Sequence, residues 1–388
     1  MTVTTPLELA RNSWDSNEYE AMQKVMATGQ FTMGKEVKKF EEIFAQKFGS
    51  KYAVMCNSGS SANLLAVAAL FYKKYRPVNP GEEAIVPAIS WSTSYYPLQQ
   101  YGLKLRFLDV ELDTLNIDVS KLEKALTPKT RIVVAVNILG NPCALDAIRA
   151  FCDKHGLYLF EDNCESMGAT LNSKACGTFG DIGTFSSFFS HHISTMEGGI
   201  CTTENRELYD ILVSLRSHGL SADTKIYEKS DFIEDGRFIL PGYNVCPTEL
   251  NGAIGIEQMK KLDRFIAVRR ENGAFFQQLM QGDDRFIIQR ENGKSSWFAF
   301  AVILNPKLKL DRKVFLKALK ERGIEQRPII CGNFLRHHVI QYFDYETFGP
   351  IINADIAHDY GFYIGNHPVD IKPQLLVVRE ILDKIASP

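Results

Sequence analysis

The N-terminal part of the chain alternates short apolar runs with amphipathic segments, and this alternation constrains the fold most. Segments with helical spacing lie at 61–75, 119–126 and 144–156. The apolar runs between them lie at 51–56, 82–88, 104–110, 131–137 and 157–162. Nearly continuous apolar runs are typical of strands that are covered on both faces. Repeated strand–helix alternation therefore predicts an α/β fold with a mostly parallel sheet and right-handed crossovers.

The pattern changes after Gly199 and predicts a second, smaller domain. We expect strands at 199–203 and 295–305, and helices at 204–217, 247–278, 311–322 and 373–386. A chain of 388 residues exceeds the usual size of a single core. We predict an N-terminal arm at 1–20, a large domain at 21–250 and a small α/β C-terminal domain at 251–388.

Composition excludes several classes of function. The net charge is −2, so there is no basic field to attract nucleic acid or an anionic membrane. No stretch approaches the roughly 18 apolar residues that a membrane span needs, and the N-terminus lacks the features of a secretory signal. The eight cysteines are scattered without a C-x-x-C pair, which predicts neither a metal site nor an iron–sulfur cluster. Such thiols suit a reducing cytoplasm.

The first predicted strand ends in a candidate anion site. The run CNSGSSANLL places Gly59, Ser60 and Ser61 directly after the strand at 51–56. Gly59 lets a ligand approach the backbone closely, and the N–H groups at a helix N-terminus favour an anion. The run is neither a dinucleotide fingerprint nor a Walker loop. The alternative is an ordinary serine N-cap.

Two more strand ends carry candidate ligand contacts, because parallel sheets bind ligands at the carboxyl ends of their strands. Trp91 follows the strand at 82–88 and either stacks on a planar ring or simply packs. Glu161 and Asp162 end the strand at 157–162, with Glu165 close behind. A buried acid is costly unless a cation faces it. A protonated ring nitrogen would serve, and a helix-capping acid is the alternative.

The last candidates are His191 and His192, which follow the apolar run FSSFF and precede a Met-Glu-Gly-Gly turn. Neighbouring residues on an extended strand point to opposite sides, so this pair does not suit one metal ion. A structural histidine that caps a turn remains an alternative. Four features match the needs of pyridoxal phosphate: a loop for an anion, a flat side chain, an acid for a ring nitrogen, and a polar position after the next strand.

These motifs resemble those of the fold-type I, sugar-modifying pyridoxal-phosphate enzymes, the DegT/DnrJ/EryC1 aminotransferases, which have an aspartate aminotransferase-like fold. The likeness extends over nearly the whole chain and includes FTMGKEVKKFEEIFAQKFG, SGSSANLL, EDNCESMGA and LPGYNV. The family's usual lysine stands a few residues before a Gly-Gly turn, where this chain has His191. The run HHISTMEGG resembles the 3-dehydratase branch, which removes a sugar hydroxyl instead of adding an amine.

The resemblance implies a cofactor role for each matching residue. Gly59, Ser60 and Ser186 would hold the phosphate of the cofactor. Trp91 would stack on its pyridine ring, and Asp162 would pair with the ring nitrogen.

The resemblance also implies contacts at the edge of the site. Glu165 would lie beside the ring, and Asn244 of the GYN motif would reach the cofactor of a second subunit, which implies a homodimer with shared active sites. Similar chains often have an arginine where this chain has Cys246. Arg327 and His218 are candidate substrate contacts.

The implied reaction removes the C3 hydroxyl of GDP-4-keto-6-deoxy-D-mannose, a step toward the dideoxysugar colitose. Glutamate would convert non-covalently bound pyridoxal phosphate to pyridoxamine phosphate, and the products would be GDP-4-keto-3,6-dideoxy-D-mannose, 2-oxoglutarate and ammonia. His191 would move a proton, because its reference pKa of about 6.5 lies near working pH, but it cannot tether the cofactor as a lysine does. A nucleotide-sugar C4 aminotransferase and a catalytically silent binding protein are the alternatives.

Overall fold

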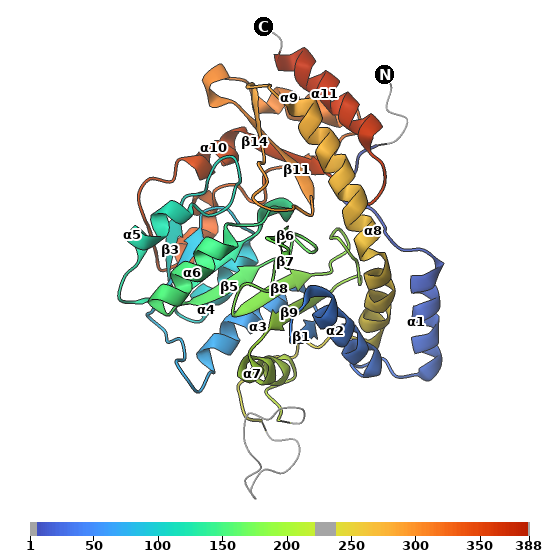
Figure 1. Cartoon of the computed structure of the whole chain (residues 1–388), viewed down its shortest axis with the longest axis vertical. Helices are drawn as coiled ribbons and strands as arrows, with labels where there is room; N and C mark the ends of the chain where they lie inside the picture. Colours follow the sequence, from blue (N-terminus) through green and yellow to red (C-terminus); the bar gives the residue numbers. More distant parts are fainter. Residues whose placement is uncertain (1–5, 222–237, 387–388) are drawn as a thin grey trace, which may run out of the picture.

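The computed structural model describes residues 6–221 and 238–386, which contain a large and a small β-sheet flanked by helices (Figure 1). The large sheet has the strand order β1-β9-β8-β5-β4-β2-β3-β13. Its strands are β1 (Tyr52–Cys56), β2 (Glu83–Pro87), β3 (Lys104–Leu108), β4 (Thr130–Val136), β5 (Tyr158–Asp162), β8 (Ile182–Ser186), β9 (Gly199–Thr203) and β13 (Tyr345–Thr347).

The large sheet is mostly parallel, as the sequence predicts. The run from β8 through β5, β4, β2 and β3 to β13 pairs in parallel throughout. Only β9 runs against its neighbours β1 and β8 in this sheet of the described chain. The α/β fold class is therefore confirmed, and the carboxyl ends of the parallel strands share one edge.

Helices cover both faces of the large sheet because alternate side chains of each strand point to opposite faces. Ala84 and Val86 pack with α3 (Gly59–Phe71), whereas Ile85 between them packs with α6 (Leu145–His155). On the second face, α2 (Lys35–Phe48) packs against Met55 of β1. The helix α3 is apolar around most of its circumference, which fits a helix buried between the sheet and α7 (Arg206–Arg216).

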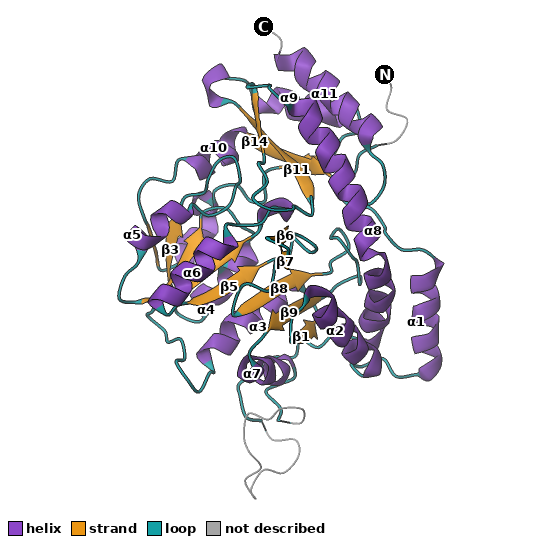
Figure 2. Ribbon diagram, viewed as in Figure 1, coloured by secondary structure: helices purple, strands orange, loops and turns teal. Residues whose placement is uncertain are grey.

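The small sheet is antiparallel and lies near the C-terminal end of the chain (Figure 2). Its order is β10 (Phe286–Ile288), β11 (Ala299–Leu304), β14 (Gly361–Gly365) and β12 (Gln326–Arg327). The helices α9 (Arg312–Glu321) and α11 (Lys372–Ala386) share one apolar cluster with these strands. The shorter elements are α4 (Tyr96–Gln100), α5 (Leu122–Ala125), β6 (Thr170–Leu171), β7 (Lys174–Ala175) and α10 (Asn353–Tyr360).

One long helix, α8 (Glu249–Met280), joins the two sheets (Figure 1). It packs against α1 (Ser16–Thr28) and α2 beside the large sheet, and against α11 beside the small one. The predicted domain boundary at 250 falls in the first turn of α8, and the predicted arm includes the start of α1. These boundaries stay predictions, and residues 1–5, 222–237 and 387–388 of the predicted domains lie outside the described residues.

Three chemical features of the described residues bear on function. None of their helices is long and apolar enough to cross a bilayer. The eight cysteines are all free thiols. No cluster of three or more histidine, cysteine or acidic side chains in residues 6–221 and 238–386 could hold a metal ion.

Candidate active site

A cavity of about 300 Å³ opens at the carboxyl ends of the parallel strands, between the two sheets. The structure brings most of the predicted site residues together there. Those that line the cavity are Gly59, Ser60, Trp91, Asp162, Glu165, Ser186, His191 and Arg327.

The N-terminus of α3 forms one end of the cavity. Ser58 is the N-cap residue, and its hydroxyl accepts a hydrogen bond from the backbone N–H of Ser61 at 3.1 Å. Gly59 and Ser60 are therefore free of the capping role and line the cavity beside Ser186. Because the first N–H groups of a helix lack partners within the helix, this end suits an anion such as a phosphate.

We expect Gly59→Ala to weaken binding of pyridoxal phosphate by about 5- to 150-fold, the equivalent of about 1–3 kcal/mol of overpacking. A Cβ atom at this position would lie 2.7 Å from Cβ of Ser186 and 3.1 Å from Sγ of Cys164. The N-terminus of α3 must then move away from the end of β8. Fluorescence titration of the apoprotein with the cofactor measures the change, and an unchanged dissociation constant would contradict the close packing.

Asp162 ends β5 and is 5% exposed in the cavity wall. Its Oδ2 atom accepts hydrogen bonds from Asn63 Nδ2 at 2.9 Å and Ser94 Oγ at 2.6 Å. Its Oδ1 atom accepts one from the backbone N–H of Cys164 at 3.1 Å. All three partners are neutral donors. A carboxylate buried among neutral donors calls for a cation from outside the protein, and the protonated nitrogen of a pyridine ring fits.

Glu161, the neighbouring acid, has a structural role. Its side chain is fully buried and accepts hydrogen bonds from the backbone N–H groups of Phe179 and Gly180 at 3.0 and 3.2 Å and from that of Gly177 at 2.5 Å. These bonds fix the loop that leads into β8. Glu161 does not line the cavity, so the two adjacent acids have separate roles.

Glu165 lines the cavity three residues beyond the end of β5. Burial raises the pKa of its carboxyl group to about 8, and the nearby charge of Asp162 acts in the same direction. The backbone N–H of Leu139 donates to it at 3.0 Å. Leu139 has a φ of 54°, a left-handed conformation that non-glycine residues seldom adopt. At neutral pH this side chain is mainly protonated and can donate a hydrogen bond to a ligand.

His191 lies in a bend after β8, not on an extended strand, and faces the cavity. Its Nδ1 atom lies 2.7 Å from the carbonyl oxygen of Cys164. A carbonyl can only accept, so Nδ1 carries the proton of the neutral ring and Nε2 has a free lone pair. Burial lowers the pKa of this imidazole to about 4. The ring of Phe298 packs against it with centroids 5.1 Å apart.

His192 points away from the cavity. Its ring is 1% exposed, and Nε2 lies 3.2 Å from the carbonyl oxygen of Ser296. Burial lowers its pKa well below the ordinary value. The two histidines therefore face different surroundings, as their adjacency predicts, although the reason is the bend and not a strand.

The mouth of the cavity is aromatic and cationic. Trp91 is 56% exposed, so a large part of its indole ring remains available for stacking. Arg327 and Tyr363 are paired in register on β12 and β14 and reach the cavity from the small sheet. Arg327 is exposed, so its guanidinium is accessible to an anionic ligand.

Two predicted residues, Asn244 and His218, do not line this cavity. Asn244 pairs with Ser217 in an isolated antiparallel bridge, and the backbone N–H of His218 donates to the carbonyl of Tyr243 at 2.6 Å. Both side chains are exposed. Their predicted contacts with a second subunit's cofactor and with substrate stay predictions.

Sequence reasoning missed several cavity residues, among them Asn63, Ser94, Phe298 and Tyr363. Asn63 lies one turn beyond Gly59 along α3, and this helical spacing is a signal that could have pointed to it. Phe298 and Tyr363 come from the small sheet, more than 100 residues further along the chain than His191 or Asp162. No local pattern connects them to the site.

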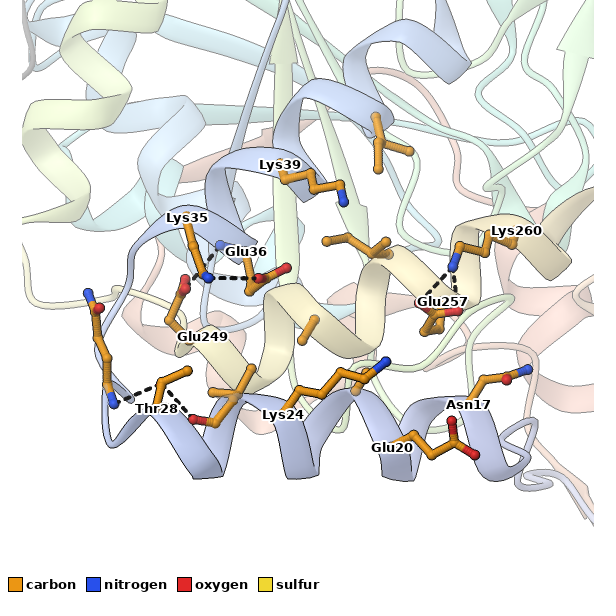
Figure 3. Close-up of a pocket in the computed structure, with 16 residues that line it drawn as sticks. Asn17, Glu20, Lys24, Thr28, Lys35, Glu36, Lys39, Glu249, Glu257 and Lys260 are labelled. Atoms are coloured by element: carbon orange, nitrogen blue, oxygen red, sulfur yellow. Dashed lines mark hydrogen bonds and ion pairs between the residues drawn. The ribbon is translucent and has the colours of Figure 1, made fainter.

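A second and larger cavity, of about 780 Å³, lies between α1, α2 and α8 (Figure 3). Two of its acids already have structural partners. Glu249 accepts hydrogen bonds from the backbone N–H groups of Gly34, Glu36 and Val37 at the start of α2, and Glu257 pairs with Lys260. None of the predicted site residues lines it. This cavity lies between packed helices, whereas the predicted site residues gather in the smaller cavity.

Comparisons with known proteins identify the family of this chain. The chain matches the DegT/DnrJ/EryC1/StrS aminotransferase family over residues 12–362. It is 49% identical over 384 residues to GDP-4-keto-6-deoxy-D-mannose 3-dehydratase of Yersinia pseudotuberculosis, covering 97% of this chain and 98% of that protein. The same enzyme of Escherichia coli O55:H7 is 48% identical over 382 residues, 96% of this chain and 98% of the other.

A solved structure has the same fold. It is a crystal structure of GDP-4-keto-6-deoxymannose-3-dehydratase with a trapped PLP-glutamate geminal diamine. Its TM-score to this chain is 0.94 at 47% sequence identity, and the match covers 97% of this chain and 100% of the other.

Proposed function

The chain belongs to the DegT/DnrJ/EryC1/StrS aminotransferase family, and on that premise we propose that it removes the C3 hydroxyl of GDP-4-keto-6-deoxy-D-mannose. The cofactor is pyridoxal phosphate, and the amino donor is glutamate. One observation carries the proposal beyond the family: within the described chain, the cavity that faces Asp162 is lined by His191 and by no lysine. An imidazole can move a proton but cannot tether an aldehyde.

The chain's residues meet the needs of the cofactor at three points. The N-terminus of α3, with Ser60 and Ser186, receives the phosphate. The exposed face of Trp91 would pack on the pyridine ring, and Asp162 would accept a hydrogen bond from the ring nitrogen. When bound, pyridoxal phosphate supplies an amino group taken from glutamate and an electron sink that allows the C–O bond at C3 of the sugar to break.

His191 is the proton-transfer residue of the proposed reaction. The Cys164 carbonyl fixes its Nδ1–H, so Nε2 is the atom that takes up and returns a proton in the cavity. The rings of Phe298 and Phe188 contact the imidazole, with centroids 5.1 and 6.1 Å away, and help to hold its orientation. The lowered pKa keeps the imidazole in its basic form before substrate binds.

The overall reaction balances without a further oxidant or reductant. Glutamate is oxidised to 2-oxoglutarate and ammonia, which consumes one water and provides two electrons and two protons. C3 of the sugar is reduced from a carbinol to a methylene, and its hydroxyl leaves as water. Net, one keto sugar and one glutamate give one dideoxysugar, one 2-oxoglutarate and one ammonia.

We also propose an oligomeric state and a cellular location for the protein. The first is a homodimer, in which the exposed Asn244 and His218 of one subunit serve the cavity of the other; a light-scattering mass equal to that of a single chain would contradict it. The second is a cytoplasmic location, because eight free thiols suit a reducing compartment.

The substrate is tested with three 4-keto-6-deoxy sugars that carry GDP, CDP or dTDP, each supplied with glutamate. We expect the highest kcat/KM with the GDP sugar, together with equal yields of 2-oxoglutarate and ammonia. Arg327 would contribute by pairing with a carboxylate or a diphosphate. An aminated sugar with 2-oxoglutarate but no ammonia would make the protein an aminotransferase, and no product at all would make it a binding protein.

A further inference from the structure

The carboxylate of Asp162 is oriented by side chains that lie on other elements of the fold. Asn63 on α3 and Ser94 after β2 both donate to Oδ2, at 2.9 and 2.6 Å. Oδ1 accepts the backbone N–H of Cys164 at 3.1 Å. Oδ2 therefore already has two donors, whereas Oδ1 has acceptor capacity left for a ligand in the cavity.

Asn63 is itself held in one orientation. Its Nδ2 atom lies near two groups that only accept, the Asp162 carboxylate and the carbonyl oxygen of Thr93 at 3.3 Å. Its Oδ1 atom accepts a hydrogen bond from the Thr184 hydroxyl at 2.6 Å. Asn63 is 1% exposed and Thr184 is fully buried, so water does not compete for these bonds. The amide cannot turn over without leaving buried groups unpaired.

A second chain of hydrogen-bonded hydroxyls holds Ser94, the other side-chain donor to Asp162. Ser94 Oγ donates to Asp162, so it accepts from Ser90 Oγ at 2.7 Å. Both serines are fully buried. The Asp162 carboxylate is thus fixed by two hydrogen-bond chains, one from Thr184 on the neighbouring strand β8 and one from Ser94 in the segment after β2.

We propose that Thr184 and Asn63 are positioning residues for the cofactor: their chain holds the Asp162 carboxylate so that Oδ1 meets the pyridine nitrogen and keeps it protonated. The inference rests on the proposed function in one respect: it requires that pyridoxal phosphate binds in this cavity. Thr184 does not line the cavity, and its hydroxyl reaches the Asp162 carboxylate through Asn63. Loss of its hydroxyl leaves Asn63 Oδ1 buried without a donor and frees the amide to turn away from Asp162.

The test compares Thr184→Val, which removes the hydroxyl at similar shape, with Thr184→Ser, which keeps it. Each full-length protein is loaded with pyridoxal phosphate labelled with ¹⁵N in the ring, and the ¹⁵N chemical shift reports whether the ring nitrogen is protonated. We expect Thr184→Val to move the signal toward the unprotonated value and to weaken cofactor binding about tenfold. Thr184→Ser restores both.

A matched control separates positioning from a general loss of packing. Thr202 on β9 is a buried threonine whose hydroxyl donates to the Gly177 carbonyl at 2.6 Å, away from the cavity. Thr202→Val is expected to leave the ring-nitrogen signal unchanged. Ser94→Ala removes the other side-chain donor to the Asp162 carboxylate. If Thr184→Val does not fold, the ¹⁵N signal of Ser94→Ala decides whether the proposal holds.

A wild-type ¹⁵N signal in both Thr184→Val and Ser94→Ala would overturn the proposal. Equal shifts in Thr184→Val and Thr202→Val would overturn it too. Both readouts use the cofactor alone, so they do not change if the sugar or its nucleotide has been assigned wrongly.

Discussion

Replacing His191 with asparagine is expected to lower kcat roughly 100- to 10,000-fold, the usual contribution of a general acid–base group. Asparagine is polar and of similar reach, but it cannot take up a proton. The phosphate end, Trp91 and Asp162 are untouched, so cofactor binding is expected to persist. Single-turnover release of 2-oxoglutarate and formation of the dideoxysugar together locate the lost step.

His192→Asn is the matched control, one residue along the chain. His192 makes a single hydrogen bond to the Ser296 carbonyl and does not line the cavity. One hydrogen bond contributes about 0.5–1.5 kcal/mol, so we expect activity within about tenfold of wild type. The reverse order of effects would assign the proton transfer to His192 and refute the role of His191.

The pH profile gives an independent check on the same residue. Burial lowers the pKa of His191 to about 4, so the imidazole is neutral, and therefore basic, at every pH above that value. The acid limb of kcat/KM, which reports the free enzyme, is expected well below pH 6.5. An acid limb near 6.5 would indicate that the proton-transfer group is an exposed histidine.

The largest expected loss of stability follows from Arg216→Met. Arg216 is 5% exposed and pairs with Glu41, and burial raises the pKa of the Glu41 carboxyl despite this partner. The pair also binds the backbone of β1, the edge strand of the large sheet. The N–H of Met55 donates to Glu41 at 2.7 Å, and the carbonyl of Met55 accepts from Arg216 at 2.7 Å. Removal of one partner from a buried pair costs about 3–5 kcal/mol.

Urea unfolding measures this loss, with two comparison variants. Lys317→Met breaks an exposed pair with Glu321, whose side chains are 80% and 64% exposed, and is expected to cost less than about 1 kcal/mol. Adding Glu41→Gln to Arg216→Met removes the unpaired charge and is expected to recover part of the stability. Equal losses for Arg216→Met and Lys317→Met would show that the buried pair has no special role.

The sequence reveals those parts of the site that follow strand ends. Gly59 and Asp162 stand at or just after the end of an apolar run, and a parallel sheet brings such positions to one edge. Ser186 is implied by the family resemblance alone. Asn63 and Ser94 escape notice because a polar residue within an apolar helix, or within a serine-rich run, has no distinctive spacing. Their importance depends on Asp162, which is distant in sequence.

Long-range strand pairing limits what the fold prediction can include. The pairing of β13 with β3 joins residues 345–347 to a strand more than 200 positions earlier, and the ion pair of Glu346 with Lys104 accompanies it. The antiparallel placement of β9 between β1 and β8 is equally hidden, because a five-residue apolar run does not indicate its direction. Apolar periodicity predicts where strands and helices lie in the sequence. It does not predict which strands pair, because pairing depends on tertiary packing.

The continuous helix α8 restricts how the two halves of the molecule can move. Its 32 residues span about 48 Å at 1.5 Å per residue. About two-thirds of the way along it, Arg269 is 3% exposed and donates to the carbonyls of Phe298 and Asn366, which flank β11 and β14. A rigid rod clamped at this point leaves no free hinge, so ligand entry must rely on small shear displacements and not on wide opening. Arg327 and Tyr363 are then preorganised opposite His191 before any ligand arrives.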